Sequence, residues 1–448
     1  MRYATCRTRI VIIWRRCDQR GENGMRPEAE LKIRYTAENA MPGGMATINK
    51  ENIANMKTSQ KRYDAVVVGG GMVGAAAALG LAQAGWSVAL LEHQAPQAFE
   101  AQSPPDLRIS AIGCTSVGLL KQLGAWQAVL AMRCAPYRRL ETWEWESSRV
   151  AFDAASLGLP ELGFMVENRI LQLALWQRLE QSPNLALCCP ARLQSLQRVG
   201  EHWQLTLDGA ETLEARLVVG ADGAQSQVRN LAGIGTNGWQ YRQSCMLITV
   251  ETGEPQQDVT WQRFFPSGPR AFLPLYDRWA SLVWYDSPQR IRQLQAMPPA
   301  QLEREIAAAF PARLGRVKVH AAGSFPLARR HAQRYVLPGL ALVGDAAHTI
   351  NPLAGQGVNL GYRDVDALLN LLSEAREQGE DWSSEAVLMR YQRRRRTDNL
   401  LMQSGMDLFY TAFSNNLAPL SVARNLALMA AQRAGKLKEH ALKYALGL

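Results

Sequence analysis

The stretch Ala65-Val66-Val67-Val68-Gly69-Gly70-Gly71-Met72-Val73-Gly74 decides the fold of this chain. Its four apolar residues, three of them β-branched, are typical of a buried strand, and a glycine-rich turn follows at once. The alanine-rich stretch 75–84 has high helix propensity and ends at Gly85, a residue that favours helix termination. Residues 88–92 then have the composition of a second strand. This order predicts a β-α-β unit at the start of a parallel sheet.

The turn has the spacing Gly69-x-Gly71-x-x-Gly74, and Glu92 follows some twenty residues later. Glycines permit a tight turn and let a pyrophosphate approach the backbone, where the N–H groups of a helix start favour an anion. A carboxylate at Glu92 suits a ribose hydroxyl and would repel a 2′-phosphate, so the motif predicts FAD or NAD rather than NADP. The alternative, a turn that only packs a helix on a strand, would not need Glu92.

Two later segments repeat the pattern of a strand followed by a polar turn. Residues 217–219 precede Asp222 and Gly223, and residues 340–343 precede Gly344 and Asp345. Each places a carboxylate at the C-terminal end of a strand, where parallel sheets bind ligands. Glycines around Gln356 would expose backbone N–H groups at a helix start, which suits the negative charge of a reduced flavin. Either motif alone could instead be a strand-to-helix cap.

The rest of the chain divides into three kinds of sequence. Residues 1–56 show no convincing periodicity, so we expect an unstructured extension, with Met56 as the natural start; a targeting peptide is the rival, and acidic residues argue against it. The alternating, aromatic-rich segments 260–265, 270–274 and 281–285 predict antiparallel sheet. After Pro352 the pattern is helical, most clearly at 392–401 and 420–446.

Composition excludes several classes of protein. The chain has 448 residues, of which 47% are hydrophobic and 20% charged, an ordinary globular balance that excludes disordered and coiled-coil proteins. Seven scattered cysteines form no CxxC pair, so neither a zinc site nor a disulfide framework is predicted, and a reducing, cytoplasmic compartment fits. The sequence contains no run of 18 apolar residues, so no transmembrane helix is predicted.

The positive charge lies at the two ends of the sequence. The formal net charge is +10, of which residues 1–56 carry +4, residues 57–385 carry −1 and residues 386–448 carry +7. The run Arg393–Arg396 could bind nucleic acid, form a solvated helix face or contact a membrane. No nucleic-acid motif accompanies it, so we expect no nucleic-acid partner. A basic, amphipathic C-terminus could contact anionic lipid, with charges at Arg424, Arg433, Lys436, Lys438 and Lys443 around Leu426, Leu437 and Leu442.

In order and spacing, the three motifs resemble those of the single-component flavoprotein aromatic hydroxylases, the family of para-hydroxybenzoate hydroxylase. The resemblance implies an α/β fold with a discontinuous Rossmann-like FAD-binding domain, an inserted and mostly antiparallel β-sheet substrate domain, and a C-terminal helical region. It implies FAD as cofactor, with NADH or NADPH as a transient electron donor, and no metal. The cofactor-binding residues that it implies are Gly69, Gly71, Gly74, Glu92, Arg108, Gln172, Asp222, Gly223, Asp345, Pro352, Gly355, Gly357 and Asn359.

Within this class, segments 108–112, 165–168, 347–361 and 403–407 resemble the bacterial ubiquinone-biosynthesis hydroxylases. Segments 143–146, 284–288 and 442–448 are most similar to the demethoxyubiquinol hydroxylase branch. The resemblance implies hydroxylation of a prenylated quinol by O₂ through a flavin C4a-hydroperoxide. It also implies contacts with proteins of a quinone biosynthetic complex and a place at the inner face of the bacterial cytoplasmic membrane.

An electron-rich quinol ring needs no strong general base, so His348, the candidate catalytic base, is expected to be structural or to contact the flavin. Two alternatives remain open: an FAD-dependent reductase of a prenyl or aromatic substrate that inserts no oxygen, and a silent FAD-binding scaffold in a quinone biosynthetic complex. The predicted boundaries are 57–135, 206–238 and 336–385 for the FAD-binding domain, 136–205 and 239–335 for the substrate domain, and 386–448 for the C-terminal helices.

Overall fold

The computed structural model describes residues 61–255, 257–350, 357–415 and 417–435, together with Lys438 and four residues near the N-terminus. The chain divides into two compact units, residues 1–57 and residues 58–448. In the first unit, β1 (Ile10–Val11) and β2 (Arg34–Tyr35) pair antiparallel, which differs from the predicted lack of regular structure at those four residues. The rest of the predicted extension lies outside the described residues, as do Pro352 and Gly355.

The first sheet of the larger unit has eight strands and contains the predicted β-α-β unit. Its parallel part runs β10-β4-β3-β13, and β20 also pairs parallel with β13. The run Ala65–Val67 is fully buried, as expected for a strand covered on both faces. The strands are β3 (Lys61–Val68), β4 (Val88–Leu91), β10 (Leu185–Cys188), β11 (Leu193–Val199), β12 (His202–Leu207), β13 (Thr212–Gly220), β19 (Val336–Leu337) and β20 (Leu340–Leu342).

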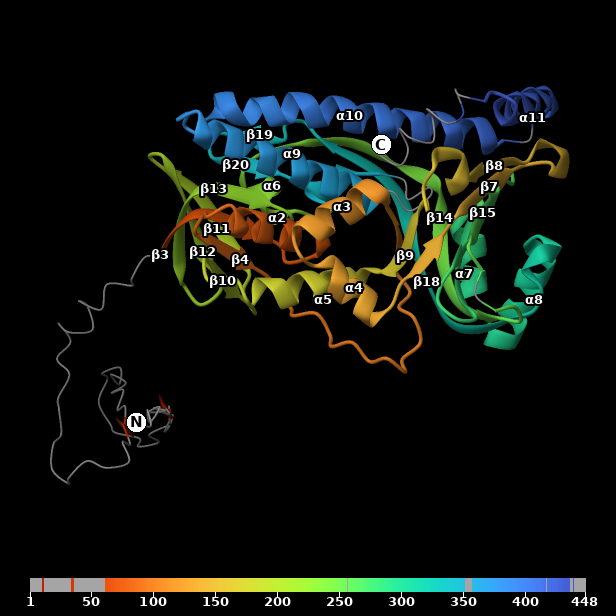
Figure 1. Cartoon of the computed structure of the whole chain (residues 1–448), viewed down its shortest axis with the longest axis horizontal. Coiled ribbons are helices and arrows are strands. Elements are labelled where there is room, and N and C mark those ends of the chain that lie inside the picture. Colours follow the sequence, from red (N-terminus) through yellow and green to blue (C-terminus); the bar gives the residue numbers. More distant parts are fainter. Residues whose placement is uncertain are drawn as a thin grey trace, which may run out of the picture. The chain divides into compact units, whose positions relative to one another are not determined.

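Helices pack around this sheet, and α2 is central among them (Figure 1). Glycine lets α2 and α9 approach closely, because a Cβ at Gly80 would lie 2.3 Å from Cδ1 of Leu369. The helices are α2 (Met72–Gln83), α3 (Cys114–Gln122), α4 (Trp126–Met132), α5 (Asn168–Leu179), α6 (Gln227–Leu231) and α9 (Gly357–Glu377).

The second eight-stranded sheet is antiparallel except where β7 pairs with β15. Its side chains alternate: Met246, Ile248 and Val250 pack under α7 (Pro288–Gln295) and α8 (Pro299–Ala309), whereas Cys245 and Leu247 face a cavity on the other side. Its strands are β7 (Arg139–Trp143), β8 (Val150–Asp153), β14 (Thr236–Thr252), β15 (Val259–Arg263), β16 (Arg270–Pro274), β17 (Trp279–Asp286), β18 (Val317–Ala332) and β21 (His348–Thr349). A three-stranded sheet comprises β5 (Ile109–Gly113), β9 (Gly163–Glu167) and β6 (Ala135–Tyr137).

Two helices, α10 (Glu385–Phe413) and α11 (Ala418–Gln432), end the described chain (Figure 1). The predicted helical C-terminus is confirmed: α11 ends at Gln432, and the rest of the predicted segment 420–446, apart from residues 433–435 and Lys438, lies outside the described residues. Gly435 adopts a φ of +50°, a conformation that favours glycine and stops a helix. Among the described helices, none is long and apolar enough to cross a membrane.

The predicted fold class is confirmed, but one predicted boundary does not follow the sheets. Residues 136–205 were assigned to the substrate domain, yet β10, β11 and β12 all pair into the first sheet. The change from one sheet system to the other comes after β9, which ends at Glu167. Pairing between strands that are distant in sequence decides this boundary. Strand β10 (Leu185–Cys188) belongs to the first sheet because it pairs with β4 (Val88–Leu91).

Candidate functional site

The turn before α2 is an open cradle at the end of β3. Gly71 is the N-cap of α2, and among the described side chains none caps this helix start. A Cβ at Gly71 would meet no described atom within 4 Å, whereas one at Gly74 would lie 1.9 Å from the carbonyl oxygen of Gly69. Gly69 itself has a φ of +102°, which side chains rarely allow. Two glycines therefore shape the turn, and Gly71 leaves space above it for an anionic group.

Glu92 closes the base of this cradle. Its carboxylate accepts hydrogen bonds from the backbone N–H of Gly70 at 2.6 Å and of His93 at 2.8 Å. Gln172 and Trp176, both on α5, donate to the carbonyl oxygen of Gly70, each at 2.8 Å. The structure thus brings Glu92 and Gln172 to the glycine turn. Sequence reasoning missed Trp176, whose position four residues after Gln172 on a helix was the available signal.

The second motif is tied to the third by an arginine. Asp222 accepts hydrogen bonds from the backbone N–H of Gln227 at 2.6 Å and of Val228 at 3.0 Å. Its other oxygen, Oδ1, is buried and has no partner among the described residues. Arg229 donates to the carbonyl oxygen of Ala346 at 2.9 Å, across to the third motif. Arg229 is a further site-organising residue that the sequence analysis did not single out.

The third motif splits into an open carboxylate and a buried histidine. Asp345 opens into the cavity but is enclosed by protein, and this loss of bulk water raises the pKa of its carboxyl, opposed by His348 and Arg108. His348 is 2% exposed, and its Nε2 lies 2.5 Å from Oδ2 of Asp364. Because His348 does not line the described part of the cavity, its place favours a structural role.

Asp364 anchors α10 to the third motif. Burial alone would raise the pKa of Asp364, but the facing charges of His348 and Arg395 lower it to about 2. Arg395 donates to Oδ1 of Asp364 at 2.8 Å and to Asn399 at 2.8 Å. Arg395 is 5% exposed, so the run Arg393–Arg396 is not a uniform surface patch. The reading of that run as one solvated or membrane-facing patch is wrong at its third residue, since a buried carboxylate attracts it inward.

The predicted basic, amphipathic C-terminus is wrong at one residue of α11. Arg424 is 8% exposed and binds Glu144 through Nη2 at 2.5 Å and Nε at 2.7 Å. It therefore holds α11 against the end of β7 and is not part of a basic surface. Lys438 donates to the carbonyl oxygen of Ala151 at 3.1 Å. Lys436, Leu437, Leu442 and Lys443 lie outside the described residues.

A cavity of about 1130 Å³ runs from the cradle to the second sheet. At one end it is lined by residues of the predicted site: Gly71, Arg108, Gly223, Asp345 and Gly357. At the other it meets the inward face of the sheet, with Leu247 and Val283, and the α10 residues Met402 and Met406. Asn359 lies beside it, donating to the carbonyl oxygen of Ala111 at 2.7 Å and accepting from Ser116 at 2.7 Å.

These features fit FAD. The uncapped helix start at Gly71 suits a pyrophosphate, and the buried Oδ1 of Asp222, which has no partner among the described residues, can accept from a ligand hydroxyl. Within the described part of the chain, no group of three or more histidine, cysteine, aspartate or glutamate side chains is placed to hold a metal ion.

Comparisons with known proteins agree with this geometry. Residues 62–400 match a family model described as an FAD binding domain. The chain is 65% identical over 382 residues to the Escherichia coli K12 protein named 3-demethoxyubiquinol 3-hydroxylase, covering 85% of this chain and 98% of that one. It is 33% identical to the mouse mitochondrial ubiquinone biosynthesis monooxygenase COQ6, covering 86% and 90%. The crystal structure of p-nitrophenol 4-monooxygenase from Pseudomonas putida shares the fold, with a TM-score of 0.71 and 19% identity, covering 86% and 98%.

The fold and the site define a class of protein, the FAD-dependent flavoproteins with a β-sheet domain beside the cofactor domain. The chain belongs to the FAD-binding family of flavoprotein monooxygenases that includes the ubiquinone-biosynthesis hydroxylases.

Proposed function

We propose that this chain is an FAD-dependent monooxygenase that hydroxylates the ring of a prenylated benzoquinol, demethoxyubiquinol, in ubiquinone biosynthesis. The observation that carries the proposal is the single cavity that joins the cofactor motifs to an apolar sheet face. A site of this kind can hold an apolar, ring-bearing substrate against a cofactor. The 65% identity to a relative named for this reaction supports the same substrate.

The residues of this chain would bind FAD, orient the substrate and shield the reaction from water. Gly69, Gly71 and Gly74 would form the turn that admits the pyrophosphate, and Glu92 would serve the ribose, as in a dinucleotide-binding motif. When bound, FAD supplies the activation of O₂ that ring hydroxylation requires.

The protein's own share is to hold the ring in place and to keep water out of the reaction. The cavity walls formed by Leu247, Val283 and Met406 are apolar and suited to this exclusion. His348 faces Asp364 rather than the cavity, so no proton step is assigned to it. A quinol ring that is already rich in electrons is consistent with a site in which no described residue is assigned as a base.

NADH or NADPH is the proposed electron donor. The sequence has no second G-x-G-x-x-G unit that would form a separate nicotinamide domain, which fits a donor that visits the FAD site transiently. Stopped-flow reduction of the FAD-loaded protein by each donor tests this proposal. Rapid bleaching of the flavin absorbance by one donor supports it, and failure of both donors, with and without substrate, contradicts it.

Quinone profiling by mass spectrometry tests the proposed substrate. Cells that lack the protein are expected to accumulate a ubiquinone precursor short of its last ring hydroxyl, and re-expression of the chain should remove it. A normal quinone pool in the deleted cells would contradict the substrate. A reductase would instead alter the saturation of the prenyl chain, and a silent scaffold would restore the pool even after FAD binding is abolished by substitution.

We further propose a cytoplasmic location with peripheral contact at the inner face of the bacterial membrane, beside other proteins of quinone biosynthesis. Support comes from α11 and the residue before it, where Leu417, Leu420 and Leu426 are 60%, 49% and 58% exposed, with Arg433 also exposed. Exposed apolar side chains next to a cation suit an anionic lipid surface.

Vesicle flotation tests the membrane contact. Replacing Leu417, Leu420 and Leu426 together by serine should lower binding of the full chain to phosphatidylglycerol vesicles about tenfold or more, because three apolar anchors are lost. Leu130→Ser is the matched control, since Leu130 is 44% exposed on α4. Equal binding by the triple variant and the wild type would contradict the proposal.

A further inference from the structure

One face of α10 forms a wall of the cavity. Leu401, Met402, Gly405, Met406 and Phe409 all line it, at spacings that place them on one side of a helix. From Leu401 to Phe409 this wall is about 12 Å long, at the usual rise per residue. A Cβ at Gly405 would meet no described atom within 4 Å, so there is open space at the middle of this wall.

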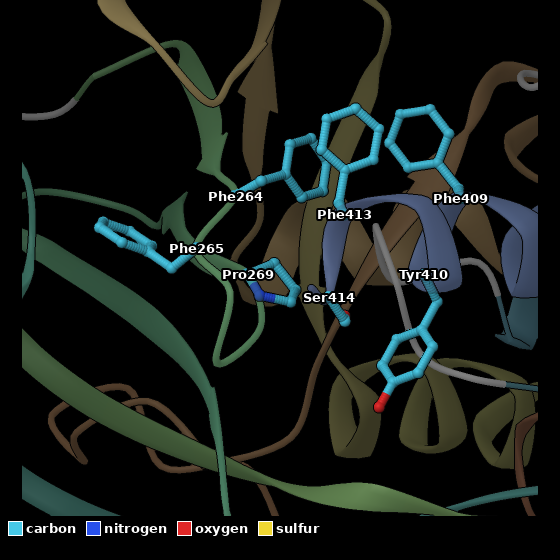
Figure 2. Close-up of a pocket in the computed structure, with 7 residues that line it drawn as sticks. All are labelled: Phe264, Phe265, Pro269, Phe409, Tyr410, Phe413 and Ser414. Carbon is cyan, nitrogen blue, oxygen red and sulfur yellow. The ribbon is translucent and has the colours of Figure 1, made fainter. Parts of the chain in front are cut away.

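The far end of this wall lies beside a small aromatic pocket of about 10 Å³, drawn in Figure 2. Its lining residues are Phe264, Phe265, Pro269, Phe409, Tyr410, Phe413 and Ser414. Phe264, Pro269 and Phe409 line the large cavity as well, so the two spaces adjoin. The rings of Phe264 and Phe409 lie 5.3 Å apart between centroids, and those of Phe264 and Phe413 lie 4.3 Å apart. The described lining of this pocket holds no charged side chain.

Beyond the pocket the surface remains apolar. Phe409 is 40% exposed, Leu408 is 73% exposed and Leu417 is 60% exposed, all at the end of α10 or just after it. The charged residues of the described lining, Arg108, Glu141, Arg330 and Asp345, come from other elements than α10. The face of α10 that lines the cavity is therefore uncharged from Leu401 to Phe409.

We propose that the prenyl chain of the substrate leaves the cavity along this face of α10 and reaches the surface beside Phe409. The inference rests on the proposed function and adds a binding site for the chain. A prenyl chain carries no hydrogen-bonding group, so a route without charges, lined by Met402, Met406 and Phe409, binds it at no desolvation cost to polar groups. This route leaves the quinol ring at the end of the cavity that carries Arg108 and Asp345.

Gly405→Phe tests the route, because it fills the open space in the middle of the wall. The experiment uses the full chain loaded with FAD and compares hydroxylation of a long-tailed quinol with that of its tail-free analogue. The ratio of the KM for the long-tailed quinol to the KM for the analogue is expected to rise about tenfold, the pattern of a lost uniform binding interaction.

Ser404→Phe is the matched control, since Ser404 is exposed and does not belong to the described lining. It should leave the ratio of KM values unchanged. An unchanged ratio in Gly405→Phe, or an equal rise in both variants, would overturn the route and leave the proposed function intact.

A binding measurement separates the two proposals. The change in intrinsic tryptophan fluorescence when a long polyprenol, which has no quinol ring, binds beside Trp261 in the cavity reports the route without catalysis. Wild type and Ser404→Phe should bind it, and Gly405→Phe should bind it about tenfold more weakly. Should the wild type hydroxylate neither quinol yet show this pattern, the proposed function fails and the route stands. Equal polyprenol binding by all three proteins would overturn the route.

Discussion

At the scale of single residues, two glycines of one motif perform different tasks. A Cβ at Gly74 collides with the backbone of Gly69, whereas a Cβ at Gly71 points into open space. Gly74→Ala should therefore lower the free energy of unfolding of the apoprotein by about 1–3 kcal/mol, as overpacking does. Gly71→Ala should change it by less than about 0.5 kcal/mol.

Both glycine variants should bind FAD more weakly than the wild type, by about tenfold or more, because each alters the turn that receives the pyrophosphate. Urea unfolding gives the stability, and titration with FAD followed by flavin fluorescence gives the affinity. Unchanged FAD affinity in Gly71→Ala would show that the open space at this turn is not where the cofactor approaches.

Asp364 gives a second prediction at this scale. Its pKa of about 2 lies below the ordinary 3.8, so the native state holds the proton less tightly than the unfolded chain. The stabilisation, about 2–3 kcal/mol, is complete above pH 4 and is lost as the pH falls toward 2. Asp364→Asn leaves Arg395 without its buried counter-charge and should cost about 3–5 kcal/mol near pH 7.

Urea unfolding at neutral pH and at pH 3 measures this effect. The difference between wild type and Asp364→Asn should shrink at pH 3. Asp366→Asn, half-buried two residues further along α9, is the matched control and should have a small effect at both values. An equal loss in the two variants would show that the Asp364 pairs contribute nothing specific.

The sequence predicted these residues unequally. Gly69, Gly71, Gly74 and Glu92 form a local pattern, and all four meet at one turn. Asp364 and Arg395 are 31 positions apart, and nothing local distinguishes Arg395 from the arginines beside it. Only the packing of α10 against α9 shows which arginine of the run is buried.

At the scale of elements, an ion pair between Arg424 and Glu144 ties α11 to the end of β7, and hydrogen bonds from Ser421 and Asn425 to Glu144 add to it. Burial alone would raise the pKa of Glu144, but Arg424 and its other hydrogen-bond donors hold that pKa below its usual value. Arg424→Met should lower the free energy of unfolding by about 3–5 kcal/mol, because Glu144 is left buried without its counter-charge. Arg433→Met, at an exposed position just after the same helix, should change it by less than about 0.5 kcal/mol.

Urea unfolding of the full chain tests this contrast. If the two arginine variants were equally stable, α11 would not depend on the Glu144 pair. The prediction differs from the sequence-based expectation, in which Arg424 and Arg433 belonged to one basic face. The helical pattern placed the two arginines on one element, but the partner, Glu144, comes directly after β7, 280 positions earlier.

The elements themselves were predicted best where the signal is local. Strand β3 and helix α2 follow from β-branched and alanine-rich runs. The predicted domain of β10, β11 and β12 is wrong, because β10 pairs with the distant β4, and β11 and β12 join the first sheet through β13, which pairs with the distant β3. The length of α10 also exceeded the predicted segment, because its polar positions at Arg395 and Gln403 are buried by partners on other elements.

At the scale of the whole larger unit, two sheets with different connections enclose one cavity. The parallel sheet brings Gly71, Gly223 and Asp345 to one end, as expected where the C-terminal ends of parallel strands meet. The antiparallel sheet supplies an apolar face at the other end, with α10 along its side. Sequence reasoning predicted both domains. It could not predict the cavity that joins them, because the cavity depends on the register of β14, β17 and β18.

The central claim is that this chain inserts an oxygen atom from O₂ into a quinol ring held in that cavity. The most direct measurement follows the isotope of oxygen in the product. The FAD-loaded protein, its electron donor and a demethoxyquinol are incubated under heavy-isotope dioxygen, and the product is analysed by mass spectrometry. We expect one labelled hydroxyl on the ring for each product molecule. Oxidation of the electron donor with an unlabelled or unhydroxylated product would contradict it.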